Sequence, residues 1–276
     1  MRDEKLGKWG RLTSRRLGKD KKAASPAISM VIITAVTIVL VTVTASYAYQ
    51  VLDFQQGASE FEAAKKSFLA FDDAVRDVAW DQGGSRSARF ALNRGSLSVV
   101  LNTSLVLNVA EYPSANYSTS TGYVRYNLST TYVTFGDGYE SFILGDNRTI
   151  VSASAESFGR GLVKQEFGKA SIILSYRVRA FREGPTTLVS STQVSYVDVL
   201  IVRINATNTA SYIGDFDLVA RNTGLTTVTR GPYNVISGNI CSISVSLGAA
   251  TSSLIVNLDP GKVVFNFVIA DIRIST

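Results

Sequence analysis

The chain changes its pattern of hydrophobic and polar residues twice. From Ala23 to Leu52, thirty successive positions carry no charged side chain, and about 20 such residues suffice for a helix to cross a hydrocarbon layer of about 30 Å. From Asp53 to Trp80 the pattern is that of a helix with one apolar face, and from Arg86 it alternates with period two. The sequence therefore predicts an α+β fold: a long N-terminal helix, first hydrophobic and then amphipathic, followed by a β-rich, antiparallel sandwich-like head.

The amphipathic segment carries its apolar side chains at helical spacing. We expect this face to pack against the chain's own strands, because bulky Phe residues suit a coiled-coil seam poorly. Gly57 is a point where the helix could kink, and Gly83-Gly84 predicts its end. The stripe consists of Phe54, Phe61, Ala64, Phe68, Phe71, Val75 and Val78.

The head is expected to be an antiparallel sandwich or a twisted sheet wrapped on the end of the helix. Val197–Ile204 has the composition of a central strand buried on both faces, whereas Gly184-Pro185, Gly231-Pro232 and Pro260-Gly261 predict turns. A helical period appears only near Ala153–Gly161. The predicted strands are 86–92, 97–100, 105–109, 123–128, 140–144, 170–181, 189–204, 241–247 and 262–274.

Net charge is confined to the N-terminus. Residues 1 to 23 hold nine basic and three acidic side chains, which accounts for the whole net charge of +6, and the remainder is balanced with 19 of each sign. A basic segment before an apolar helix is expected to stay in the cytoplasm and to direct the rest of the chain outward. No nucleic-acid partner is expected, because the basic residues are not spread over the predicted head.

The residue types needed for common catalytic chemistry are scarce. The sequence has no histidine, and Cys241 is its single cysteine, so neither a Ser-His pair nor an intramolecular disulfide can form. We expect Cys241 to be a buried apolar residue. Asp215 and Asp217 lie on one side of a strand, a pattern more typical of solvated carboxylates than of an acid–base pair. We predict no enzyme activity, no cofactor and no metal site.

Five Asn-x-Ser/Thr motifs follow the apolar segment, and none precedes it. This motif is the acceptor for N-glycosylation on exported surfaces. The candidate sites are Asn102, Asn116, Asn127, Asn147 and Asn205.

Three interpretations compete for the N-terminal segment. A secretory signal peptide is disfavoured because its apolar core is only about 7 to 15 residues long. A plain signal anchor and a leader that is cut before the apolar helix both fit the length. Lys22-Ala23-Ala24-Ser25-Pro26, followed by an aliphatic run to Leu40, resembles the start of archaeal type IV pilins, which carry a class III (prepilin-type) signal peptide. The chain has Ile28 where bacterial pilins carry a Glu.

The resemblance implies cleavage between Ala23 and Ala24 by a prepilin peptidase. Independently of it, Pro26 suits the first turn of a helix, with Ser25 as the N-cap. Retention of the helix would allow it to rest in the membrane and later to pack against copies of itself, other pilin subunits and the assembly machinery. The residues expected to make these contacts are Ile28, Val31, Ile32, Val36, Val39 and Leu40.

We therefore expect a type IV pilin-like subunit of an archaeal cell-surface filament, with a minor or pseudopilin-like subunit as a variant of this role. The alternative is a single-pass membrane-anchored binding or coat protein that never polymerises. The expected parts are a basic leader (1–23), a transmembrane or filament-core helix (24–52), an amphipathic continuation (53–82) and an extracellular head (83–276).

Overall fold

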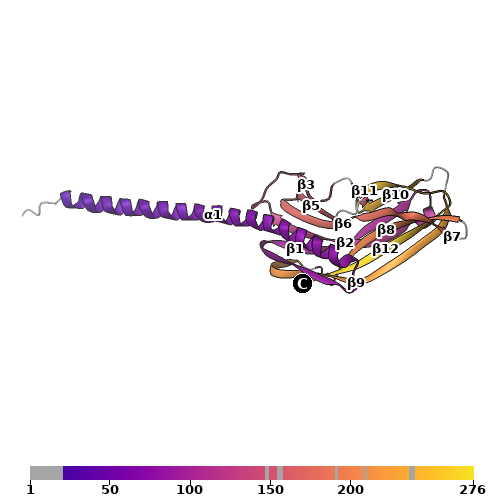
Figure 1. Ribbon diagram of the computed structural model, residues 1–276. Helices are drawn as coiled ribbons and strands as arrows, with labels where there is room; N and C mark the ends of the chain where they lie inside the picture. Colours follow the sequence, from indigo (N-terminus) through magenta and orange to yellow (C-terminus); the bar gives the residue numbers. More distant parts are fainter. Residues whose placement is uncertain are drawn as a thin grey trace, which may run out of the picture. The chain divides into compact units, whose positions relative to one another are not determined.

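The computed structural model describes residues 21–146, 149–153, 158–189, 192–207, 209, 211–235 and 240–276. The chain divides into two compact units, residues 1–52 and 53–276. The described residues form one α-helix, α1 (Lys21–Ala79), one 3-10 helix, η1 (Pro113–Ala115), and twelve strands (Figure 1). The strands are β1 (Ser85–Val109), β2 (Tyr117–Ser129), β3 (Glu140–Leu144), β4 (Val151–Ser152), β5 (Gly159–Glu166), β6 (Lys169–Tyr176), β7 (Val178–Val189), β8 (Thr192–Ala206), β9 (Tyr212–Asn234), β10 (Ile240–Leu247), β11 (Ala250–Asn257) and β12 (Lys262–Ser275).

The apolar stripe of α1 packs on the strands of its own unit, as predicted. Phe61, Phe68 and Phe71 are fully buried, and the Phe68 ring meets Phe90 of β1 edge-on at a centroid distance of 5.5 Å. Burial of a Phe side chain contributes about 2 to 3 kcal/mol. Phe54 differs from the rest of the stripe because 46% of its surface is exposed. The packed face therefore begins one heptad later than the sequence pattern suggests.

Gly57 is a packing position rather than a kink. The residue is buried, and α1 continues through it. A Cβ atom at this position would lie 2.5 Å from the Tyr132 side chain, so the glycine allows the turn after β2 to approach the helix backbone. Close packing therefore explains the glycine, and the helix is not broken there.

A buried asparagine from β9 caps the C-terminal end of α1. The Asn222 amide donates hydrogen bonds to the carbonyls of Val78 and Ala79, at 3.0 and 2.9 Å. These carbonyls belong to the last turn of α1, whose C=O groups have no N–H partner within the helix. Thr223 is an extra residue in β9 between Asn222 and Gly224, which pair with Ile272 and Asp271 of β12. This β-bulge accompanies a side chain that reaches from the sheet to the helix end.

Replacing Asn222 by alanine should lower the free energy of unfolding by about 2 kcal/mol, because the Ala79 carbonyl loses its side-chain donor and the Val78 carbonyl keeps only the Asp81 N–H. Urea unfolding of the full chain in detergent measures this effect. Asn234→Ala, at an exposed position of the same strand, is the matched control and should stay within about 0.5 kcal/mol of the wild type. Equal stability of both variants and the wild type would contradict the capping role.

The twelve strands form one hydrogen-bonded sheet instead of the two sheets expected for a sandwich. Its main path runs β3-β5-β6-β2-β1-β9-β12-β8-β7-β4, and β10 and β11 branch from β1. Most neighbours are antiparallel, but β12 pairs with β8 in parallel, and β4 pairs with β7 in parallel. A β-rich head is thus confirmed, although its strands are not all antiparallel.

Two separate hydrophobic cores lie on this one sheet. The first contains the stripe of α1 with β1, β2, β5, β6 and the ends of β8 and β12. The second contains β7, β10 and the other parts of β1, β8 and β12. In β12, Phe265 and Phe267 belong to the second core, whereas Ile272 and Ile274 belong to the first. Side chains alternate between the two faces along a strand, and in β12 the second core takes odd-numbered residues and the first core takes even-numbered ones. The two cores therefore lie on opposite faces of the sheet.

Strands β8 and β12 pass from the second core to the first between two successive residue pairs. Ile201 and Ile269 pair with each other and belong to the second core, and the next pair, Val202 and Ala270, belongs to the first. Two adjacent residues of each strand are therefore buried on opposite faces. The prediction that Val197–Ile204 is a central strand is confirmed, since β8 lies between β7 and β12 and is buried in both cores.

Some local predictions are wrong because strands continue through residues that usually break them. Gly184-Pro185 lies within β7 and Gly231-Pro232 within β9. In both cases a register irregularity at this point allows the pairing to resume. The helical period near Ala153–Gly161 is also wrong where the structure describes it, because residues from Gly159 form β5. The turn at Pro260-Gly261 is confirmed between β11 and β12.

Candidate assembly helix and surface sites

The apolar part of α1 exposes almost every side chain in the single chain. Residues 28–50 are exposed without interruption, and the most apolar window of the helix has none of its residues buried. By length and composition this helix qualifies to cross a membrane. Such a helix near the N-terminus is typical of a membrane anchor and also of a signal sequence.

The six residues predicted to make assembly contacts all lie in this exposed region. Ile28, Val31 and Leu40 expose 59, 69 and 61% of their surface. An isolated large apolar surface in water is unfavourable by roughly 25 cal/mol per Å², so lipid or protein must cover it. Ile32, Val36 and Val39 are exposed to a similar extent.

Threonine hydroxyls in the apolar segment are satisfied by the helix itself. Thr34, Thr37 and Thr42 each donate to the carbonyl four residues earlier, at 2.8, 2.7 and 2.9 Å. This back-bonding removes the cost of placing a free hydroxyl in an apolar environment. The polar residues of the segment are therefore compatible with lipid and with a dry helix–helix contact.

The predicted processing site lies in the first turns of α1. The helix begins at Lys21 and includes Lys22, Ala23, Ala24, Ser25 and Pro26. The expectation that Ser25 caps a helix starting at Pro26 is therefore wrong, because the helix continues five residues further toward the N-terminus. In this position Pro26 cannot donate a hydrogen bond to the carbonyl of Lys22, four residues earlier.

Four of the five predicted glycosylation sites fall on described residues of the head. Asn102, Asn116 and Asn205 are exposed, whereas Asn127 is half-buried. The Asn127 Oδ1 atom accepts hydrogen bonds from Arg125 and Ser171, both at 2.8 Å, which makes it the least accessible of the four. Asn147 lies outside the described residues. Asn102 has a φ of 64° at a bulge of β1, a conformation that Asn adopts more readily than most residues.

The remaining candidates from the sequence occupy ordinary structural positions. Cys241 is buried in β10, and burial raises the pKa of its thiol to about 12, with Glu111 nearby adding to the effect. Such a thiol is protonated and inert at neutral pH. Asp215 and Asp217 are both exposed, and Asp215 lies 3.6 Å from Arg89. The described residues contain no group of three or more His, Cys, Asp or Glu side chains that could hold a metal ion.

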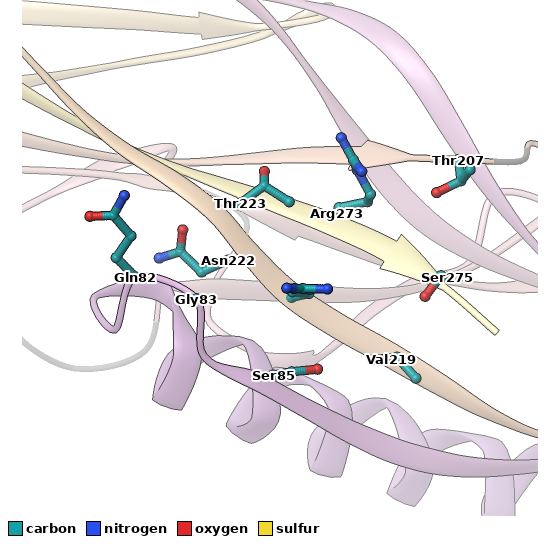
Figure 2. A pocket seen from close by; sticks show the side chains of 10 residues that line it. Gln82, Gly83, Ser85, Thr207, Val219, Asn222, Thr223, Arg273 and Ser275 are labelled. Carbon is teal, nitrogen blue, oxygen red and sulfur yellow. The ribbon is translucent and has the colours of Figure 1, made fainter.

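A polar pocket of the C-terminal unit was not found from the sequence. It has a volume of about 690 Å³ and lies where the turn after α1 meets β9 and the end of β12. Figure 2 shows Gln82 and Gly83 from this turn, Ser85 from β1, Thr223 from β9, and Arg273 and Ser275 from β12 around it. Arg221 of β9 also lines the pocket. Its residues are distant in sequence, so only the strand register brings them together.

Comparison with known proteins gives one match. A profile described as a family of unknown function (DUF7289) matches residues 22–138, which is less than half of the chain. The matched segment begins at Lys22 and covers the apolar helix, β1 and β2. No curated protein and no solved structure was found to match the chain.

Proposed function

We propose that the chain is a type IV pilin-like subunit of an archaeal cell-surface filament, processed between Ala23 and Ala24 by a prepilin peptidase. The observation that carries this proposal is the uncharged helical segment 28–50, whose side chains are exposed in the single chain. Before assembly, lipid covers this surface, and the head lies outside the cell. After assembly, copies of the same helix cover it. No catalytic step is part of this function.

The position of Pro26 supports cleavage after Ala23. In the uncut chain, Pro26 is the sixth residue of α1, a position at which a proline lacks the N–H for the bond to the carbonyl four residues earlier. Cleavage after Ala23 would make Pro26 the third residue of the mature chain. The first four N–H groups of a helix have no partner within it, so the missing N–H of Pro26 would then cost nothing.

Close packing, rather than exclusion of water, decides whether the helix prefers lipid or its own copies. Lipid tails are as apolar as the side chains of Val and Ile, so helix association in a membrane depends on shape and on interhelical hydrogen bonds. The segment is rich in β-branched residues, which have few rotamers to lose on packing. Ala35, Val36, Val39 and Leu40 line a shallow apolar depression of about 270 Å³, into which a neighbouring helix can insert side chains.

N-terminal mass spectrometry of the membrane fraction tests the processing step. We expect a mature chain that starts at Ala24. Ala23→Leu should abolish this product, because the expected cut follows a small residue, whereas Lys19→Gln, elsewhere in the basic leader, should leave it unchanged. A chain that still starts at Met1, or identical processing of the Ala23→Leu variant, would refute cleavage at this site.

The second candidate is a single-pass membrane-anchored coat or binding protein that stays monomeric. The uncharged helix fits an anchor equally well, because its apolar surface and back-bonded threonines also suit lipid. Electron microscopy of material sheared from the cell surface separates the two. Pelletable filaments that contain this chain favour the pilin-like subunit, and recovery only after detergent extraction favours the anchored monomer.

A further inference from the structure

Two arginines stand side by side in the polar pocket of the C-terminal unit. Arg221 of β9 and Arg273 of β12 are direct cross-strand partners, so their side chains leave the same face of the sheet with Cβ atoms about 5 Å apart. Both line the pocket, and both are exposed. Like charges directly opposite each other destabilise a sheet, so this arrangement needs a compensating group.

The surrounding chain does not supply that group. On the outer sides of the pair, Arg221 is opposite Ser85 of β1 and Arg273 is opposite Asn205 of β8, both neutral. Asp271, two residues before Arg273, is bound by both arms of the Arg203 guanidinium. Within the described part of the chain, neither Arg221 nor Arg273 forms an ion pair. By contrast, two arginines of the neighbouring strand β1 do: Arg86 pairs with Asp77, and Arg89 pairs with Asp215.

The rest of the pocket is suited to a polar ligand that carries negative charge. The lining includes the hydroxyl side chains Ser85, Thr207 and Ser275 and the amide of Gln82, and among the residues that the structure describes it has no carboxylate. The carbonyls at the end of α1 would repel an anion, but the Asn222 amide already engages those of Val78 and Ala79. Paired guanidinium groups bind sulfate, phosphate and carboxylate oxygens with several charge-assisted hydrogen bonds.

We propose that this pocket binds an oxyanion carried on a small, hydroxyl-rich molecule, such as a sugar phosphate. Arg221 and Arg273 hold the phosphate oxygens, and the hydroxyl and amide side chains bind the sugar. A volume of about 690 Å³ falls in the range of small-molecule sites and exceeds what a bare ion fills. This site is independent of the assembly helix, so it does not rest on the proposed function.

Isothermal titration calorimetry of the full chain in a neutral detergent tests the site. The probes are glucose 6-phosphate, inorganic phosphate and neutral glucose, all at one ionic strength set with chloride. We expect saturable binding of glucose 6-phosphate, weaker binding of inorganic phosphate and none of glucose. Arg221→Gln and Arg273→Gln should each weaken glucose 6-phosphate binding at least about tenfold, because each removes one of two charge-assisted contacts.

Arg230→Gln is the matched control, since Arg230 is an exposed arginine of β9 outside the pocket, and it should change the affinity less than twofold. Micelles that contain phosphatidylglycerol are tested separately as a further probe. Binding there that depends on Arg221 and Arg273 assigns the phosphate to a lipid headgroup and supports the oxyanion site. Absence of saturable binding below about 10 mM with every probe, or equal loss in the Arg230→Gln variant, would overturn the proposal.

Discussion

Replacement of Glu60 by alanine is expected to lower the free energy of unfolding of the C-terminal unit by about 3 to 5 kcal/mol. Glu60 lies on α1 and is only 8% exposed. One oxygen of its carboxylate accepts hydrogen bonds from the backbone N–H of Gly95, at 2.8 Å, and from the Tyr126 hydroxyl, at 2.9 Å. The other accepts from the N–H groups of Asn93 and Arg94, at 2.9 and 3.0 Å.

The size of this effect follows from what the truncation leaves behind. Three successive backbone donors and one phenol lose their acceptor, and each buried donor without a partner costs about 1 to 3 kcal/mol, less where water enters. These donors lie where the pairing of β1 with β9 jumps from Leu92 to Leu97. The ladder with β9 therefore cannot take over from the Glu60 carboxylate, and at this bend the helix keeps only its contacts from Asp53 and Gln56 to the Arg94 side chain.

Thermal and urea unfolding of the full chain in detergent measure the change. Glu60→Gln preserves the shape and one strong acceptor and should cost less than the alanine variant. Glu62→Ala is the control, because its side chain is 64% exposed and forms only a surface pair with Lys65, so a change within about 0.5 kcal/mol is expected. An alanine variant at Glu60 as stable as the wild type would show that the carboxylate does not hold the bend.

Replacement of Asp72 by asparagine is expected to stabilise the protein at neutral pH. Asp72 of α1 is 2% exposed, and its Oδ1 atom has no hydrogen-bond partner among the described residues. Burial is the main cause that raises the pKa of this carboxyl from 3.8 to about 6, and the nearby Arg76 opposes the shift. Asp73 adds to it and Arg177 lowers it.

The sign of the pH dependence follows from the raised pKa. The folded protein binds the proton more tightly than the unfolded chain, so the contribution of Asp72 is most favourable below about pH 4. It is lost as the pH rises through about 6, and the difference of about two pKa units corresponds to about 3 kcal/mol. The neutral Asn variant should therefore be more stable by up to about 3 kcal/mol at pH 7 and nearly equal to the wild type at pH 4.

Urea unfolding at pH 4, 5, 6 and 7 tests this prediction. Asp77→Asn is the control, since Asp77 is 52% exposed at its side chain and pairs with Arg86 on the surface, and it should leave the pH profile unchanged. Parallel profiles for the wild type and the Asp72→Asn variant would contradict a buried, titrating carboxyl.

The elements with strong periodicity could be predicted from the sequence, and those without it could not. The stripe of α1 follows one buried face, and the alternation in Lys262–Ile274 changes face only once, at Ile269-Ala270, so the helix and β12 were placed closely. β4, β5, β9 and β11 were missed. In β9, residues 225–227 are all exposed, so the hydrophobic alternation that marks a strand is absent there. The signal for two cores was present as adjacent apolar residues, Ile201-Val202 and Ile269-Ala270, but it resembles an ordinary doubly buried strand.

The polar sites depend on the register of the strands, that is, on which residues of neighbouring strands lie opposite each other. Composition and spacing do not predict this register. The Arg221–Arg273 pair, the cap formed by Asn222 and the acceptor role of Glu60 each join residues that are far apart along the chain. A one-residue shift would move every side chain of a strand to the other face. The bulges at Asn102 and Thr223 produce such shifts locally, so composition and spacing could not indicate which polar residues meet.

Disulfide cross-linking through the apolar helix tests the central claim most directly. Val39→Cys places a thiol on the exposed segment, and the native Cys241 is buried and inert, so it does not interfere. In material sheared from the surface of cells that express this variant, mild oxidation should give covalent dimers, whereas Ser59→Cys, on an exposed position of α1 in the C-terminal unit, should give few. Absence of the Val39→Cys chain from sheared material, with only monomers in the detergent extract, would contradict assembly through this helix.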